Sequence, residues 1–135
     1  DGGAKLKKFG QLIEQFVGEH YGEPGMKEFT DALEDIGGKV TDTSMWVGMQ
    51  GMKNPDEVGA AAVDYLRLVG HMVYAYFWAR MAQIALPKAE SDPFYKTKLA
   101  TAQFYFARLL PETEMLVKRI RSGSKVLLSL EAENF

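Results

Sequence analysis

The chain contains no cysteine, so disulfide bonds, thiolate nucleophiles and iron–sulfur ligation are excluded from its chemistry. It also lacks a glycine-rich phosphate loop of the G-x-G-x-x-G or P-loop type and a serine in a nucleophile elbow. Di-iron helical bundles need a glutamate three residues before a histidine. Val17 and Leu68 hold those positions before His20 and His71. The sequence therefore predicts no catalytic, cofactor-binding or metal-binding residue in this chain.

The chain also has no large excess of charge of either sign. Sixteen basic and eighteen acidic residues give a net charge of −2, which argues against a nucleic-acid partner. With 135 residues, the chain is long enough for a single domain with its own core. No export signal opens the sequence, which together with the missing cysteines favours a cytoplasmic location. Because the first residue is Asp1 rather than Met, we expect a fragment of a longer chain.

One stretch, residues 68–86, is apolar enough to raise the question of a membrane span. His71, Arg80 and Gln83 lie inside it, and polar groups at these positions are costly in a bilayer. A membrane partner is therefore not expected, and the stretch is interpreted as a central core helix.

Apolar residues recur at three- and four-residue intervals in four segments, which predicts helices. The predicted helices span residues 4–21, 25–51, 55–86 and 93–121, with a tail at 123–135. Two of them begin with a capping residue followed by proline, at Asn54 and Asp92, and Glu57 is expected to complete a capping box. Short connections between long helices predict an all-α, antiparallel up-and-down four-helix bundle. A three-helix arrangement with a loosely attached first segment is the alternative.

Three local features carry expectations of their own. Gly37-Gly38 inside the second helix suggests a close approach of another helix. Pro111 predicts a kink in the fourth helix, whose apolar seam includes Phe106 and Leu109. The apolar part of the tail, residues 126–130, is expected to fold back onto the bundle.

Polar residues within the third helix predict a cross-link. In an antiparallel hairpin of equal rise, His71 lies level with both Asp35 and Arg108, and Arg67 lies level with Glu112. A buried charge is costly unless it is paired and hydrogen-bonded. We therefore expect Arg108 to pair with Asp35 beside His71, and Arg67 to pair with Glu112. A structural cross-link is favoured for this cluster over a proton relay.

Two blocks of the sequence resemble a known family. They are Ala62–Met81 (AVDYLRLVGHMVYAYFWARM) and Tyr95–Thr113 (YKTKLATAQFYFARLLPET). Both are similar to the extra C-terminal helical domain of acyl-CoA dehydrogenases, in the branch that includes 3-methylmercaptopropionyl-CoA dehydrogenases. The similarity covers most of the chain and is weaker between Phe9 and Pro55. The family's Tyr-Glu-Gly-Thr loop with its catalytic glutamate does not occur here, so no catalytic or FAD-contacting residue transfers.

The resemblance implies a parent enzyme of fatty acid metabolism. Such an oxidoreductase is a flavoprotein that removes an α-proton from an acyl-CoA and passes the β-hydride to FAD. The chain would be its accessory helical domain, without FAD of its own and inert alone. It would pack on the dehydrogenase core of the same chain or on a partner subunit in a homo-oligomer. A free-standing interaction module and a peripheral membrane anchor are the alternatives, and an exposed apolar face would favour a tethered domain.

Overall fold

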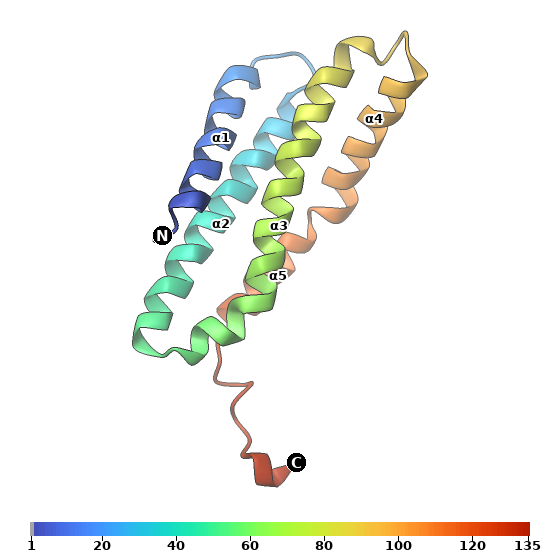
Figure 1. The fold of residues 1–135 in the computed structure, drawn as a ribbon. Helices are drawn as coiled ribbons and strands as arrows, with labels where there is room; N and C mark the ends of the chain where they lie inside the picture. Colours follow the sequence, from blue (N-terminus) through green and yellow to red (C-terminus); the bar gives the residue numbers. More distant parts are fainter. Residues whose placement is uncertain (1) are drawn as a thin grey trace.

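The computed structural model describes residues 2–135 and is helical throughout its ordered elements, with no strand in that range (Figure 1). The α-helices are α1 (Ala4–His20), α2 (Lys27–Lys53), α3 (Asp56–Ala85), α4 (Pro93–Phe104) and α5 (Glu112–Arg121). Three short turns join or follow them: the 3-10 turns η1 (Leu86–Lys88) and η3 (Ala132–Asn134), and the π-turn η2 (Tyr105–Leu109). The prediction of an all-α helical bundle is confirmed.

Turn and capping residues set several of the helix ends. Gly25, in the turn between α1 and α2, adopts φ +83°, and a Cβ there would lie 3.1 Å from the Leu86 side chain. Asp92 caps α4 by accepting a hydrogen bond from the backbone N–H of Phe94 at 2.9 Å. At the start of α3, however, the expected capping box is not formed. The Glu57 carboxylate instead accepts hydrogen bonds from the backbone N–H and hydroxyl of Ser124, at 3.2 and 2.6 Å.

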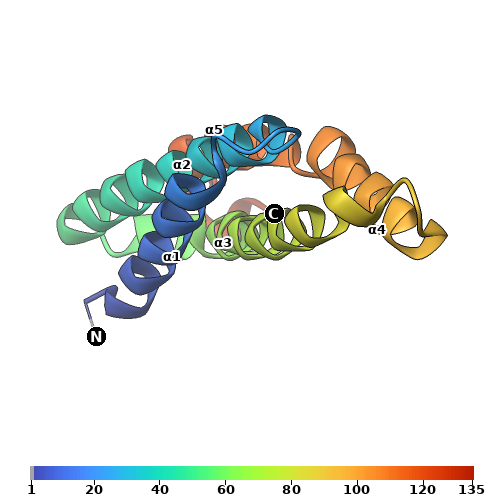
Figure 2. The same cartoon turned by 90° about the horizontal axis from the view of Figure 1, so that it is seen from above.

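The helices pack around α2 and α3. α1 covers one side of this pair, where Phe9 and Phe16 place their rings edge-on to Tyr76 of α3, with centroids 5.3 and 6.0 Å apart. α4 and α5 pack against α3, and α5 also contacts α2. Seen from above, α2 and α5 lie on one side of the molecule and α3 lies on the other (Figure 2). The lower side of α3 in that view faces away from α2 and α5.

Side-chain pairs show the direction of neighbouring helices. Arg119 of α5 pairs with Asp64, and Ser124 just beyond α5 binds Glu57, nearer the start of α3. Tyr105, before α5, reaches His71, further along α3. Later residues of the fourth segment therefore meet earlier residues of α3, so the two segments run in opposite directions.

Pro111 divides the expected fourth helix. Because proline has no backbone N–H, the regular hydrogen-bond ladder cannot continue through it. The chain forms the π-turn η2, in which the N–H of Leu110 donates to the carbonyl of Tyr105 at 2.9 Å, and α5 begins afresh at Glu112. A π-turn holds one residue more than an α-turn, so it shifts the buried side of the helix by one residue. Tyr105 and Leu110 are buried, whereas Leu109, expected in the seam, is exposed.

Two further expectations are wrong. A Cβ added to Gly37 or Gly38 would meet no atom within 4 Å outside its own local helix backbone, so no helix of this chain approaches them closely. The tail does not fold back onto the bundle. Figure 1 shows it leaving the helices, and its apolar side chains Val126, Leu127, Leu128 and Leu130 are exposed.

Candidate functional site

A polar cluster joins α3 to the π-turn and α5. The Nε2 atom of His71 lies 2.8 Å from Glu112 Oε2, and its Nδ1 atom lies 2.8 Å from the hydroxyl of Tyr105. Arg67 Nε lies 2.9 Å from the other carboxylate oxygen of Glu112. His71 and Tyr105 are buried, Glu112 is partly buried and Arg67 is exposed. The cluster therefore runs from the core to the surface.

Every polar atom of the buried end has a partner. The Tyr105 hydroxyl donates to the backbone carbonyl of His71 at 3.1 Å, which leaves its oxygen free to accept from Nδ1–H. In the charged histidine, both ring N–H groups then donate, one to Tyr105 and one to the Glu112 carboxylate. In the neutral Nε2–H form, the Tyr105 hydroxyl turns its single hydrogen from the His71 carbonyl to Nδ1. Both arrangements fit the same heavy-atom positions.

The electrostatics follow from these contacts. The hydrogen bond from His71 lowers the pKa of Glu112 below its ordinary value of 4.5, and Arg67 lowers it further, against the opposing effect of burial. Burial raises the pKa of Tyr105, with smaller contributions in the same direction from Tyr74 and Glu112. Tyr105 therefore remains a neutral hydrogen-bond donor, and Glu112 remains an anion that accepts two.

The sequence identified part of this cluster. The expected pair between Arg67 and Glu112 is present, with His71 on the same carboxylate. The expected pair between Arg108 and Asp35 is wrong. Asp35 lies on the exposed side of α2 and pairs with Lys39 one turn later, and Arg108 is exposed in the π-turn without an ion pair in the described chain. Tyr105 takes the position facing His71 because of the extra residue in that turn.

The cluster is built as a cross-link. Its hydrogen bonds connect α3 to the π-turn and to the first turn of α5, and they are satisfied within the chain. Within residues 2–135, no group of three or more His, Asp or Glu side chains could hold a metal ion. Thr43 Oγ1 is the one buried side-chain polar atom there without a partner.

The outer face of α3 has an unusual surface. Five large apolar side chains recur on one side of the helix and are exposed: Val63, Leu66, Tyr74, Phe77 and Ile84. We call this set the α3 stripe. Val63 and Leu66 are 78% and 73% exposed, and the stripe covers about 32 Å of helix at 1.5 Å per residue. α3 carries no acidic residue after Asp64, so no carboxylate interrupts most of this surface.

A row of exposed large apolar side chains along one helix face is typical of an interaction site. The signal was present in the sequence, where apolar residues cover nearly the whole circumference of 72–86. A helix that is apolar all round was interpreted as a central core helix. The structure packs one side of this helix against α2, α4 and α5 and leaves the side with the stripe exposed. No helix in the described chain is long and apolar enough to cross a membrane.

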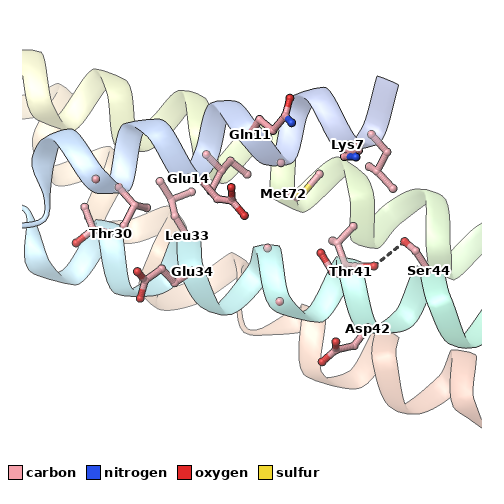
Figure 3. Close-up of a pocket in the computed structure, with 18 of the residues that line it drawn as sticks. Lys7, Gln11, Glu14, Thr30, Leu33, Glu34, Thr41, Asp42, Ser44 and Met72 are labelled. Carbon is pink, nitrogen blue, oxygen red and sulfur yellow. Dashed lines mark hydrogen bonds between the residues drawn. The ribbon is translucent and has the colours of Figure 1, made fainter. Parts of the chain in front are cut away.

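A groove lies between α1 and α2. This α1–α2 groove has a volume of about 1120 Å³ and does not include the polar cluster. Figure 3 shows Glu14 of α1 and Glu34 of α2 along the groove, with Met72 of α3 behind them and Lys7 nearer the start of α1. Gly10, Gly18, Gly37 and Gly38 line it as well.

The comparison with protein families identifies the chain. Residues 9–131 match the family described as acetyl-CoA dehydrogenase C-terminal like. The chain belongs to this family. The match includes all of α2 to α5 and reaches residue 131 of the tail, so the polar cluster and the α3 stripe both lie inside the family domain. No curated protein matches the chain significantly.

Proposed function

We propose that this chain is the accessory helical domain of an FAD-dependent acyl-CoA dehydrogenase and that it docks through the α3 stripe onto the dehydrogenase body. Membership of the C-terminal-like family supports the role as an accessory domain of such enzymes. The α3 stripe is the observation that carries the docking, because it is a long apolar face that no part of the described chain covers.

The composition of the stripe suits a protein surface. Aromatic residues are enriched at the centres of protein interfaces and charged residues are depleted there, and Tyr74 and Phe77 lie at the middle of the stripe. Arg67, at its edge, is already paired with Glu112. Docking would therefore bury the apolar side chains without leaving the charge of Arg67 unpaired.

In this proposal the chemistry belongs to the dehydrogenase body. That body holds FAD, which accepts the β-hydride of the acyl-CoA, and it carries the base that removes the α-proton. The helices of this chain form the expected antiparallel up-and-down bundle, with α4 and α5 together as the fourth member, and present a rigid docking face. The relationship to 3-methylmercaptopropionyl-CoA dehydrogenases, a homo-oligomeric parent and a cytoplasmic location belong to the same proposal.

Docking can be measured by titrating the 135-residue chain into the separately produced dehydrogenase body in a calorimeter. We expect saturable binding that Leu66→Ser with Phe77→Ser weakens by about 30-fold or more, since each removes an apolar contact worth about 1–2 kcal/mol or more. The matched control is Met49→Ser with Met52→Ser, which alters two exposed apolar residues of α2 away from the stripe and from the groove. This control should bind like the wild type.

Other outcomes would contradict the proposal. Equal losses in both double variants would show that the stripe is not the docking site. If the chain instead binds phospholipid vesicles through the stripe and ignores the dehydrogenase body, it is a membrane anchor. The chain alone, mixed with FAD, an acyl-CoA and an electron acceptor, should give no turnover. Turnover or stoichiometric FAD binding by the chain alone would also overturn the proposal.

A further inference from the structure

The C-terminal arm, residues 125–130, combines a fixed start with an uncovered apolar run. Ser124, just before it, is buried and bonded to Glu57, so the arm leaves the molecule at a defined point. Val126, Leu127, Leu128 and Leu130 are then 59–74% exposed. Exposed apolar area costs about 25 cal/mol per Å², so four such side chains in a short segment favour a covered state. The family match extends through the whole arm.

The α1–α2 groove offers the complementary surface. Ile13, Val17, Leu33 and Met72 form its apolar base. Gly37 and Gly38 lie within α2 at the groove, at a cost to helix stability of about 1 kcal/mol each relative to alanine. They face open space rather than another helix of this chain. The open glycines leave room for a peptide to lie close to the backbone of α2.

The charged groups that line the groove are mainly acidic. Its lining includes Glu14, Asp31, Glu34 and Asp42, and Lys7, nearer the start of α1, is the one basic residue in that lining. Lys7 and Glu14 are seven residues apart, or about 10 Å along a helix. In the arm, Lys125 precedes the apolar run and Glu131 follows it, and these two are about 9 Å apart if the segment is helical. A helical turn is already started there by the hydrogen bond from Leu128 N–H to Ser124 O at 3.1 Å.

We propose that the α1–α2 groove binds the C-terminal arm of a second copy of this chain. The apolar side chains of the arm cover the base of the groove, Lys125 lies against Glu14 and Glu34, and Glu131 lies against Lys7. Each copy has one arm and one groove, so a two-fold exchange fills both grooves and forms a closed dimer. The α3 stripe does not suit the arm as well, because the carboxylates beside it, Asp64 and Glu112, are already paired with Arg119 and Arg67.

The first test is the oligomeric state of the 135-residue chain by sedimentation equilibrium. We expect a dimer that becomes a monomer when residues 125–135 are deleted. Gly37→Leu with Gly38→Leu fills the groove and should also give a monomer, while raising helix propensity so that the chain still folds. Gly48→Leu is the matched control, since Gly48 lies in α2 with open space around it and outside the groove. This variant should remain dimeric.

The second test uses the absence of native cysteine. Leu128→Cys in one preparation and Gly38→Cys in another should form a mixed disulfide when the two are combined. Lys125→Glu should weaken the dimer about tenfold or more, and Glu14→Lys with Glu34→Lys in the same chain should restore it. Leu66→Ser with Phe77→Ser, which tests docking to the dehydrogenase body, should leave the dimer unchanged.

Three results would overturn the arm exchange. The first is a wild-type chain that stays monomeric at all accessible concentrations. The second is a chain carrying both cysteines that closes its disulfide within one copy, because its own arm then fills its own groove. The third is a groove-filled variant that dimerises as strongly as the wild type. None of these results bears on docking through the α3 stripe.

Discussion

The apolar side chains on the two faces of α3 differ mainly in size. The inner face is largely alanine, and the outer face carries the large apolar residues of the α3 stripe. The buried alanines are Ala61, Ala75, Ala79, Ala82 and Ala85. Small side chains allow neighbouring helices to approach closely, so at the alanine positions the inner face packs against them at short range. The outer face carries large apolar side chains of the kind found in a protein core, but no other helix of this chain covers them. Apolar character alone therefore does not indicate which side of a helix is buried.

The strongest test of this contrast is Leu68, one of the large residues buried on the inner face beside the alanines. Leu68 is 0% exposed, so Leu68→Ala should lower the free energy of unfolding by about 2–5 kcal/mol through lost burial and an unfilled cavity. Urea denaturation followed by circular dichroism measures this loss. A change below about 1 kcal/mol would mean that the inner face is not the rigid side of the helix.

At the edge between the two faces, the polar cluster should contribute a smaller, pH-dependent amount. Glu112→Gln keeps the shape and removes the charge that His71 and Arg67 contact, so it should cost about 1–2 kcal/mol near pH 7. The pKa of Glu112 is lowered in the folded state, so its contribution is complete above the ordinary value of 4.5 and is lost as the pH falls through the lowered pKa. Denaturation at several pH values should show the two proteins converging in acid. A constant difference down to pH 2 would contradict this assignment.

A stabilising change of similar size is expected in α2. Thr43 is fully buried and its hydroxyl has no partner, so Thr43→Val should raise the free energy of unfolding by about 1 kcal/mol. Thr30→Val is the control, because the buried hydroxyl of Thr30 contacts the carbonyls of Met26 and Lys27, each at 3.3 Å. Thr30→Val should not stabilise the chain. Equal stabilisation by both would show that burial alone, and not the missing partner, determines the effect.

The smallest effect on stability belongs to the outer face. Leu66→Ser and Phe77→Ser should each change the free energy of unfolding of the 135-residue chain by about 0.5 kcal/mol or less, because both side chains already contact water. Thermal denaturation of the single variants measures this. Losses approaching those of Leu68→Ala would show that the stripe contributes to the core of the chain and is not free for a partner.

For the polar cluster, residue spacing predicted how far along a helix each side chain lies, but not which way it points about the helix axis. Equal rise in an antiparallel pair placed Arg67 level with Glu112, and that pair is present. The same rule placed Arg108 level with His71, yet Arg108 faces solvent. Counting residues gives the height of a side chain along a helix, whereas its rotation about the axis depends on an unbroken 3.6-residue period. The π-turn breaks that period at Tyr105.

Asp35 shows the same limit without any break in the helix. The apolar positions of α2, with Leu33 and Ile36 buried, already place Asp35 outside the packed side. Its carboxylate therefore pairs with Lys39 along the exposed surface of the same helix. Attention to the period of the seam would have excluded Asp35 from the cluster. The position of Tyr105, in contrast, had no such signal in the sequence.

By itself the sequence determined the helical segments, their approximate ends and the pairing of Arg67 with Glu112. These follow from local propensity, capping and spacing, which need no knowledge of the neighbours. Tertiary structure decided which face of α3 is buried, where the fourth helix widens into a π-turn, and that the apolar arm does not pack on its own bundle. A helix that is apolar all round has no unique inner face in its sequence. Its buried side is chosen where small residues allow neighbouring helices to come close, and only the assembled bundle determines that.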